Sequence, residues 1–190
     1  MISKELAVVR ELRISDIIPL NKMYDSFSSE SKRYFHPGFL GLRYISFRWF
    51  LAQTSLATSA FKPLRKLLLR VYTPSVFLSM VATNEFNEII GFIFIKVKRR
   101  ASKKNFLWEL GIFVREDYQG KGVGSKLTES LIELARKENV KKIHLTVLTD
   151  NVIAIHIYKK YGFKTKRGIM GGDIWRGQRY DSIEMWLDIP

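Results

Sequence analysis

The residues best suited to chemistry form a glycine-rich run, Gln119-Gly120-Lys121-Gly122-Val123-Gly124, which follows an apolar segment and precedes a helical pattern. Glycine lets the backbone adopt positive φ and come close to a ligand. A helix N-terminus presents unpaired N–H groups and the positive end of the helix dipole. Together these features predict a site for phosphate oxygens, with extra charge available from Lys121 and Lys126. The alternative is a tight strand-to-helix turn that binds nothing.

Two familiar nucleotide motifs do not fit this loop. The Walker pattern requires Gly-Lys-Ser/Thr, but Lys121 is followed by Gly122. In the dinucleotide pattern GxGxxG, the last glycine would fall on Ser125 or Leu127. The loop therefore predicts a phosphorylated ligand that is held by neither of these two arrangements.

A second set of residues shares one face of a predicted helix. Asn151, Ala154 and Tyr158 are spaced by three and four residues, which brings them onto one side. Asparagine can hydrogen-bond an amide, alanine leaves room for a ligand, and a tyrosine hydroxyl with an ordinary pKa of about 10 can donate a proton. The alternative is that Tyr158 is a core aromatic residue.

The elements that must position these groups alternate between helix and strand. Apolar periodicity predicts helices over Ser15–Ser29, Leu42–Thr58, Val123–Ala135 and Asn151–Tyr161. Strands are predicted over Val76–Ala82, Ile89–Val97, Phe106–Val114, Lys142–Leu148 and Ser182–Leu187. This order indicates an α/β (α+β) fold with a mixed, mostly antiparallel sheet and helices on both faces.

Composition narrows the class of protein. A chain of 190 residues that is 46% hydrophobic fits a single domain, expected over 1–190, and its net charge of +14 favours an anionic partner. The chain has no cysteine, so a thiol nucleophile is excluded, and its three histidines lack metal-ligand spacing, so no metal is expected. The N-terminus lacks an apolar signal core and no run is long enough to cross a membrane, so a cytoplasmic protein is expected.

The stretch from Glu109 to Phe163 resembles the GCN5-related N-acetyltransferase (GNAT) superfamily. Its loop matches the family pattern Gln/Arg-x-x-Gly-x-Gly/Ala, and Asn151, Ala154 and Tyr158, followed by Gly162-Phe163, match the pattern Asn-x-x-Ala-x-x-x-Tyr with its Gly-Phe pair. The chain departs from the family at Glu116, where a proline is often found.

The resemblance implies the GNAT fold with splayed central strands and acetyl-CoA as co-substrate. It implies that Ile112, Phe113 and Val114, on a bulged strand, pair with the pantetheine arm, and that the Val114 N–H polarises the thioester carbonyl. Asn151 and Ala154 would also contact the cofactor, and Tyr158 would protonate the departing thiolate. The amides expected to hold the pyrophosphate belong to Gln119, Gly120, Lys121, Gly122, Val123, Gly124 and Ser125.

A general base is less clearly marked. Glu109, on the strand before the loop, is the first candidate, and a carboxylate merely paired with a nearby lysine is the alternative. Glu184 and Asp181 are lesser candidates, and His36 could line an acceptor pocket. Because no thiol is available, direct attack by a primary amine in a ternary complex is favoured.

The acceptor and the partners are not specified by any motif. Residues 1–75 are expected to form a helical acceptor-side region, and 76–190 the acetyl-CoA-binding core, of a monomer or homodimer whose acceptor is a small molecule or a peptide. Two basic runs, within 96–104 and 159–167, keep open a nucleic-acid- or ribosome-associated binding module. A non-catalytic acyl-CoA-binding member of the family is a third possibility.

Overall fold

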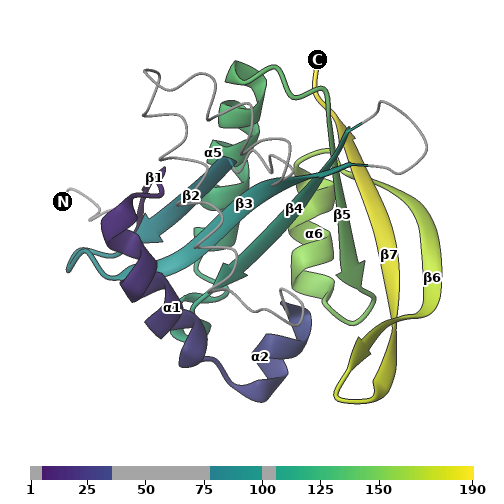
Figure 1. Ribbon diagram of the computed structural model, residues 1–190, viewed down its shortest axis with the longest axis horizontal. Helices are drawn as coiled ribbons and strands as arrows, with labels where there is room; N and C mark the ends of the chain where they lie inside the picture. The colour runs from purple at the N-terminus through teal and green to yellow at the C-terminus, as the bar shows by residue number, and fades with distance from the viewer. Residues whose placement is uncertain (1–5, 36–77, 100–105) are drawn as a thin grey trace, which may run out of the picture.

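The computed structural model describes residues 6–35, 78–99 and 106–190, which form a seven-stranded sheet with helices on both faces (Figure 1). The strands are β1 (Val8–Glu11), β2 (Leu78–Thr83), β3 (Ile89–Arg99), β4 (Phe106–Val114), β5 (Lys142–Leu148), β6 (Lys164–Trp175) and β7 (Gln178–Asp188). Their order across the sheet is β1-β2-β3-β4-β5-β7-β6. Neighbouring strands are antiparallel except β4 and β5, which are parallel. The predicted fold class, a mixed and mostly antiparallel sheet, is confirmed.

In the described ranges, four helices and two short 3₁₀ helices accompany the sheet. The helices are α1 (Ile17–Asp25), α2 (Ser29–Tyr34), α5 (Val123–Lys137) and α6 (Val152–Lys160), and the 3₁₀ helices are η1 (Ile14–Asp16) and η3 (Glu116–Tyr118). In α5 the residues that face the sheet recur every four positions and are buried: Val123, Leu127, Leu131 and Ala135.

The alternation of side chains along β4 separates two apolar clusters. Leu110 belongs to a cluster with residues of α5 and α6, whereas Phe113 belongs to one with Leu20, Phe27 and other residues near α1. Successive side chains of a strand point to opposite faces, so the two clusters lie on opposite sides of the sheet. The chemistry-bearing positions of β4 are therefore divided between an α5/α6 side and an α1/α2 side.

Strands β4 and β5 separate partway along their length. Their pairing consists of Trp108 with Ile143 and Glu109 with His144, after which β4 continues to Val114 and β5 to Leu148 without further pairing. This is the splay that the resemblance implies. The bulge that was expected in β4 is absent, because its register with β3 runs without a shift from Gly91↔Val114 to Arg99↔Phe106.

Several sequence-based boundaries differ from the structure. The helix predicted over Ser15–Ser29 is divided into η1, α1 and the start of α2. Strands β1 and β6 were not predicted, because β1 has only four residues and β6 has a basic, glycine-containing sequence with little apolar alternation. The predicted helix over Leu42–Thr58 lies outside the described residues. Among the helices that are described, none has the length and apolar character needed to cross a bilayer.

Candidate active site

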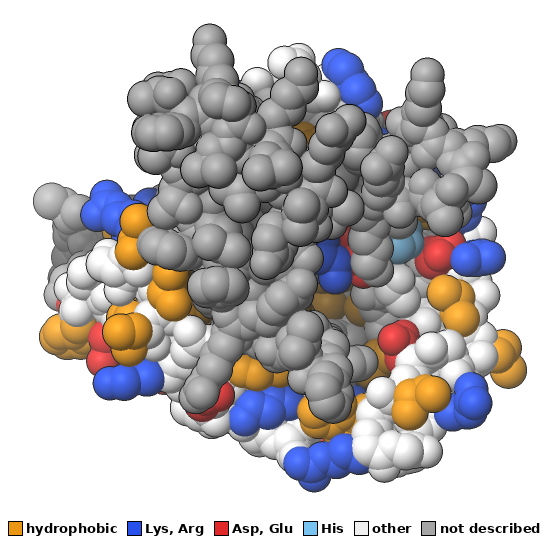
Figure 2. Space-filling model, in the orientation of Figure 1, with side chains coloured by type: hydrophobic (Ala, Val, Ile, Leu, Met, Phe, Trp, Pro, Cys, Tyr) orange, Lys and Arg blue, Asp and Glu red, His pale blue; other side chains and the backbone are white. Residues whose placement is uncertain are grey.

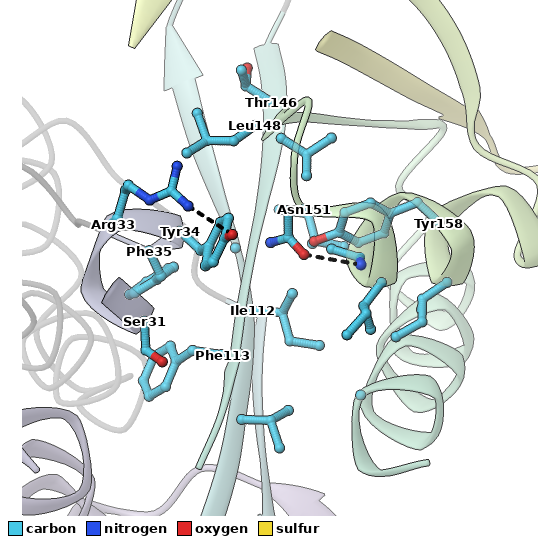
Figure 3. A pocket seen from close by; sticks show the side chains of 18 of the residues that line it. Ser31, Arg33, Tyr34, Phe35, Ile112, Phe113, Thr146, Leu148, Asn151 and Tyr158 are labelled. Atoms are coloured by element: carbon cyan, nitrogen blue, oxygen red, sulfur yellow. Dashed lines mark hydrogen bonds between the residues drawn. The ribbon is translucent and has the colours of Figure 1, made fainter. Parts of the chain in front are cut away.

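A cleft of about 390 Å³ lies where β4 and β5 separate. One wall is formed by α2 and the other by the loop after β5 and by α6, with β4 running between them (Figure 3). The lining residues named in the sequence analysis are Glu109, Ile112, Phe113, Val114, Gln119, Gly120, Gly124, Asn151, Ala154 and Tyr158. The structure thus brings the predicted strand, loop and helix positions together around one cavity.

The glycine-rich loop has the backbone geometry that its sequence predicts. Gly120 and Gly122 have φ values of 71° and 84°, which lie in the left-handed region that favours glycine. A Cβ at either position would meet no atom of the described chain within 4 Å, so the space beside the loop is open. Across the described residues, no hydrogen bond uses the amide N–H groups of residues 120–125. These amides can therefore donate to an anion at the start of α5.

The side chains around the loop have distinct roles. Gln119 donates from Nε2 to the carbonyl oxygen of Val114 at 3.0 Å, which ties the loop to the end of β4. Lys121 lies 5.4 Å from the ring centre of Tyr118 and remains beside the loop. Lys126 instead donates from Nζ to the carbonyl oxygen of Ala7 at 2.6 Å. The expectation that Lys126 supplies charge to a phosphate is therefore not supported by its position.

The backbone of β4 presents polar groups to the cleft at alternate residues. Arg115 donates its N–H to the Ile90 carbonyl on β3 at 2.8 Å, and the antiparallel pairs alternate from that point. The N–H and C=O of Phe113 consequently point to β3, whereas those of Ile112 and Val114 point to the β5 side. Phe113 contributes a buried ring, so the backbone groups of this segment that are directed to the cleft belong to Ile112 and Val114.

Asn151, Ala154 and Tyr158 lie along one face of α6, from its N-cap to its last turn. Asn151 is the N-cap residue, and its Oδ1 accepts a hydrogen bond from the Ala154 N–H at 3.2 Å. Because the cap occupies this oxygen, the side-chain NH₂ group is the part of Asn151 that can serve a ligand (Figure 3). Tyr158 is 6% exposed and its ring reaches the cleft wall. Burial raises the pKa of Tyr158 above its ordinary value, so the hydroxyl keeps its proton.

The acidic candidates occupy different positions relative to the cleft. Glu109 lines it and forms an ion pair with Lys96, the residue opposite it on β3, with 3.2 Å between Oε2 and Nζ. Glu184 does not line it and instead forms two hydrogen bonds with Arg167, which lower the pKa of the carboxyl. Asp181 accepts from the Gly171 N–H. Among these three carboxylates Glu109 alone faces the cavity.

Several lining residues are not among the predicted site residues. They are Ser31, Arg33, Tyr34, Phe35, Lys96, Thr146, Leu148, Asp150 and Asp173. Most come from α2, β5 and β6, outside the two motifs; α2 is far from them along the chain, whereas β5 and β6 directly flank the Asn151–Phe163 motif. Asp150 lies next to Asn151, and Tyr34 and Phe35 lie within residues 1–75, the region expected to form the acceptor side. His36 lies outside the described residues.

The basic runs are only partly described. In the second run, Arg167 is paired with Glu184, and Lys166 lies 4.5 Å from the ring centre of Trp186. On the face shown in Figure 2, lysine and arginine side chains are scattered around the described surface. This distribution is typical of solvated charges, and a nucleic-acid partner stays an untested prediction.

Comparison with known proteins extends the assignment beyond the two motifs. The model of the acetyltransferase (GNAT) family matches residues 42–163. Over 64 residues the chain is 38% identical to a spermine/spermidine N(1)-acetyltransferase of Bacillus subtilis. This alignment covers 33% of this chain and 42% of that protein. Over 78 residues it is 36% identical to the L-amino acid N-acetyltransferase AaaT of Escherichia coli, covering 40% and 48%. The matched segments thus span under half the length of these relatives.

Solved structures share the fold along nearly the whole chain. A ribosomal-protein-alanine N-acetyltransferase from Brucella melitensis has a TM-score of 0.70 at 18% identity, covering 95% of this chain and 99% of that one. A GNAT-family acetyltransferase from Streptococcus pneumoniae has a TM-score of 0.67 at 22% identity, covering 96% and 99%. The family match spans more than half of the chain and agrees with its strand order and motifs. The chain belongs to the acetyltransferase (GNAT) family of acyltransferases.

Proposed function

We propose that residues 1–190 form one N-acetyltransferase domain that moves an acetyl group from acetyl-CoA to a primary amine. The observation that carries this proposal is the splay of β4 from β5, which leaves the inward amides of Ile112 and Val114 in line with the open glycine loop. The amide-containing arm of acetyl-CoA fits such a strand edge, and its diphosphate fits the amides at the start of α5.

Three residues support direct transfer in a ternary complex. The amine nitrogen bonds to the acetyl carbon, the carbon–sulfur bond breaks, and the sulfur takes a proton. Val114 donates its N–H to the carbonyl oxygen and stabilises the negative charge that develops there. Glu109, which lines the cleft, accepts the proton that the attacking amine loses. Tyr158 holds a proton at its hydroxyl and supplies it to the sulfur.

The acceptor is proposed only as a primary amine. The relatives named above are acetyltransferases of polyamines and of L-amino acids, which differ in charge and size. The described cleft carries both acidic and basic side chains, so it does not select between these classes by charge alone.

The proposal is tested by following free thiol release from acetyl-CoA with the purified full chain. The acceptors should include spermidine, L-amino acids, aminosugars and lysine-containing peptides. Thiol release that depends on one of these amines, together with the acetylated product, supports an N-acetyltransferase. Tight acetyl-CoA binding with no amine-dependent release would instead indicate a non-catalytic member. An absence of acetyl-CoA binding in calorimetry would refute the site assignment.

A further inference from the structure

Helix α2 is attached at its N-terminus to the segment that leads into the glycine loop. The Ser28 N–H donates to Glu116 Oε1 at 2.9 Å, and the Ser28 hydroxyl accepts from the Ser31 N–H at 3.1 Å. Hydrogen bonds from Ser28 and Ser31 lower the pKa of Glu116, so this carboxylate stays charged at neutral pH. Glu116 begins η3, which ends one residue before Gln119. Glu116, at the position where the family often has proline, thus accepts a hydrogen bond from the residue before α2.

The C-terminal half of α2 is attached to the opposite side of the cleft. Arg33 donates from Nη1 to Asp150 Oδ2 at 2.5 Å and from Nη2 to Glu30 Oε1 at 2.5 Å. The Arg33 guanidinium also contacts the rings of Tyr34 and Tyr180, with Cζ 4.5 and 4.8 Å from their centres. The Arg33 side chain is only 9% exposed. Because Asp150 directly precedes Asn151, this ion pair joins α2 to the N-cap of the helix that carries Tyr158.

Between these two attachments, α2 and the residue after it form a wall of the cavity. Ser31, Arg33, Tyr34 and Phe35 all line the cleft (Figure 3). The Phe35 ring packs on those of Phe113 and Phe94, with ring centres 4.7 and 5.9 Å apart. Gly111 permits this contact, because a Cβ there would lie 2.6 Å from Phe94 and 3.0 Å from Phe35. The wall therefore packs on β4 and is held at one end by Glu116, before the glycine loop, and at the other by Asp150, in the loop after β5.

We infer that Arg33 is a positioning residue that couples acetyl-CoA binding to the order of the α2 wall. The inference rests on the proposed function, since the ligand must contact the loop after Glu116 and the residue after Asp150. A ligand that immobilises both loops also fixes the two carboxylates that hold α2. Coupling between binding sites is reciprocal, so an ordered α2 would in turn favour acetyl-CoA.

Hydrogen–deuterium exchange of the full chain, with and without acetyl-CoA, tests this coupling and needs no knowledge of the acceptor. In the unmodified protein, acetyl-CoA should slow exchange in both the loop at 119–126 and the wall at 28–35, the latter about fivefold or more. In Arg33→Ala the loop should remain protected by acetyl-CoA, while the wall should exchange rapidly whether or not acetyl-CoA is present.

Arg10→Ala is the matched control. Arg10 forms a comparable pair with Asp16, at 2.6 and 2.9 Å, in the same N-terminal part of the chain but away from the lining residues. Both variants should lower the melting temperature, but Arg10→Ala should keep the effect of acetyl-CoA on the wall. If Arg33→Ala does not fold, Arg33→Lys serves instead, because a lysine cannot reproduce the guanidinium fork to Asp150 and Glu30.

The outcomes separate the coupling from the proposed function. If acetyl-CoA still slows hydrogen exchange at 28–35 in Arg33→Ala, the coupling is overturned, while the acetyl-CoA site is left intact. The coupling is also overturned if, in the unmodified protein, acetyl-CoA slows hydrogen exchange in the loop at 119–126 but not in the wall at 28–35. No slowing of the loop in the unmodified protein would instead refute the proposed acetyl-CoA site, on which the coupling depends.

Discussion

Glu109 of β4 and His144 of β5 form the last pair before the two strands separate. This places the Glu109 carboxylate at the apex of the cleft, on the face of the sheet that α1 and α2 cover. His144 is 6% exposed and packs against Trp186, with ring centres 4.8 Å apart. Its Nε2 lies 3.6 Å from Glu184 Oε1. The apex therefore lies where the paired part of β4 and β5 meets the open part that lines the cleft.

Replacing the apex carboxylate tests its role as the base. Glu109→Gln removes the negative charge but keeps the shape, so kcat should fall by about 100-fold while acetyl-CoA affinity stays the same. Steady-state kinetics with the best amine of the panel and calorimetry with acetyl-CoA measure the two quantities. Glu88→Gln, which removes a carboxylate from the β2–β3 turn, should leave kcat unchanged. A kcat in Glu109→Gln equal to that of the unmodified protein would assign proton removal to another group.

The Tyr158 hydroxyl can be removed with little change in packing. Tyr158→Phe should reduce kcat by about 100-fold because the sulfur loses its proton donor, while the affinity for acetyl-CoA should be nearly unchanged. Tyr161→Phe is the matched control, since that residue ends the same helix but does not line the cleft. Equal turnover in the two variants would show that Tyr158 is only part of the core.

Gly122 can be tested against a glycine of similar backbone conformation. Gly122→Val should abolish acetyl-CoA binding in calorimetry, because a side chain would occupy the space beside the loop and valine disfavours a φ of 84°. Gly177, in the β6–β7 turn, has a φ of 82° and similarly open surroundings. Gly177→Val therefore carries a similar backbone cost of about 1–2 kcal/mol but should bind acetyl-CoA normally. Normal binding by both variants would exclude the loop as the diphosphate site.

Asp16 makes stability depend on pH at the acid end. Burial acts to raise the pKa of Asp16, but hydrogen bonds from the Arg10 side chain and the Arg13 N–H outweigh it and lower the pKa. A lowered folded-state pKa gives stability that is present above the unfolded-state value of about 4 and lost as pH falls through the folded-state value. Asp16→Asn should therefore cost about 1–3 kcal/mol at pH 7 and much less near pH 2.

Urea unfolding of both proteins at pH 7, 4 and 2 measures this difference. Asp188→Asn is the control, because Asp188 pairs with Lys142 on the surface and its side chain is 75% exposed. It should change stability little at any pH. A constant difference between Asp16→Asn and the unmodified protein across the pH range would show that the charge of Asp16 is not what stabilises η1.

The sequence predicts the parts of the site that depend on local spacing. The glycine loop and the Asn151–Tyr158 face are each contained within a few residues, so their geometry follows from strand and helix periods. The contact between Arg33 and Asp150 joins residues 117 positions apart, and no local pattern marks it. The strand bulge was expected by analogy and is absent here, because β4 keeps its register with β3 while β5 moves away from it. The short β1 and the basic β6 are strands because a neighbour supplies their hydrogen bonds.

The amides of Ile112 and Val114 that point to the cleft affect which amino-acid replacements the strand can tolerate. A main-chain donor is the same whichever side chain stands above it, so such a contact tolerates amino-acid replacement along the strand. Discrimination between long and short acyl groups would then depend on the bulk of the side chains that line the cleft. With the proposed binding of acetyl-CoA to these amides, the side chains around the acyl group can be exchanged while the main-chain hydrogen bonds to acetyl-CoA are kept.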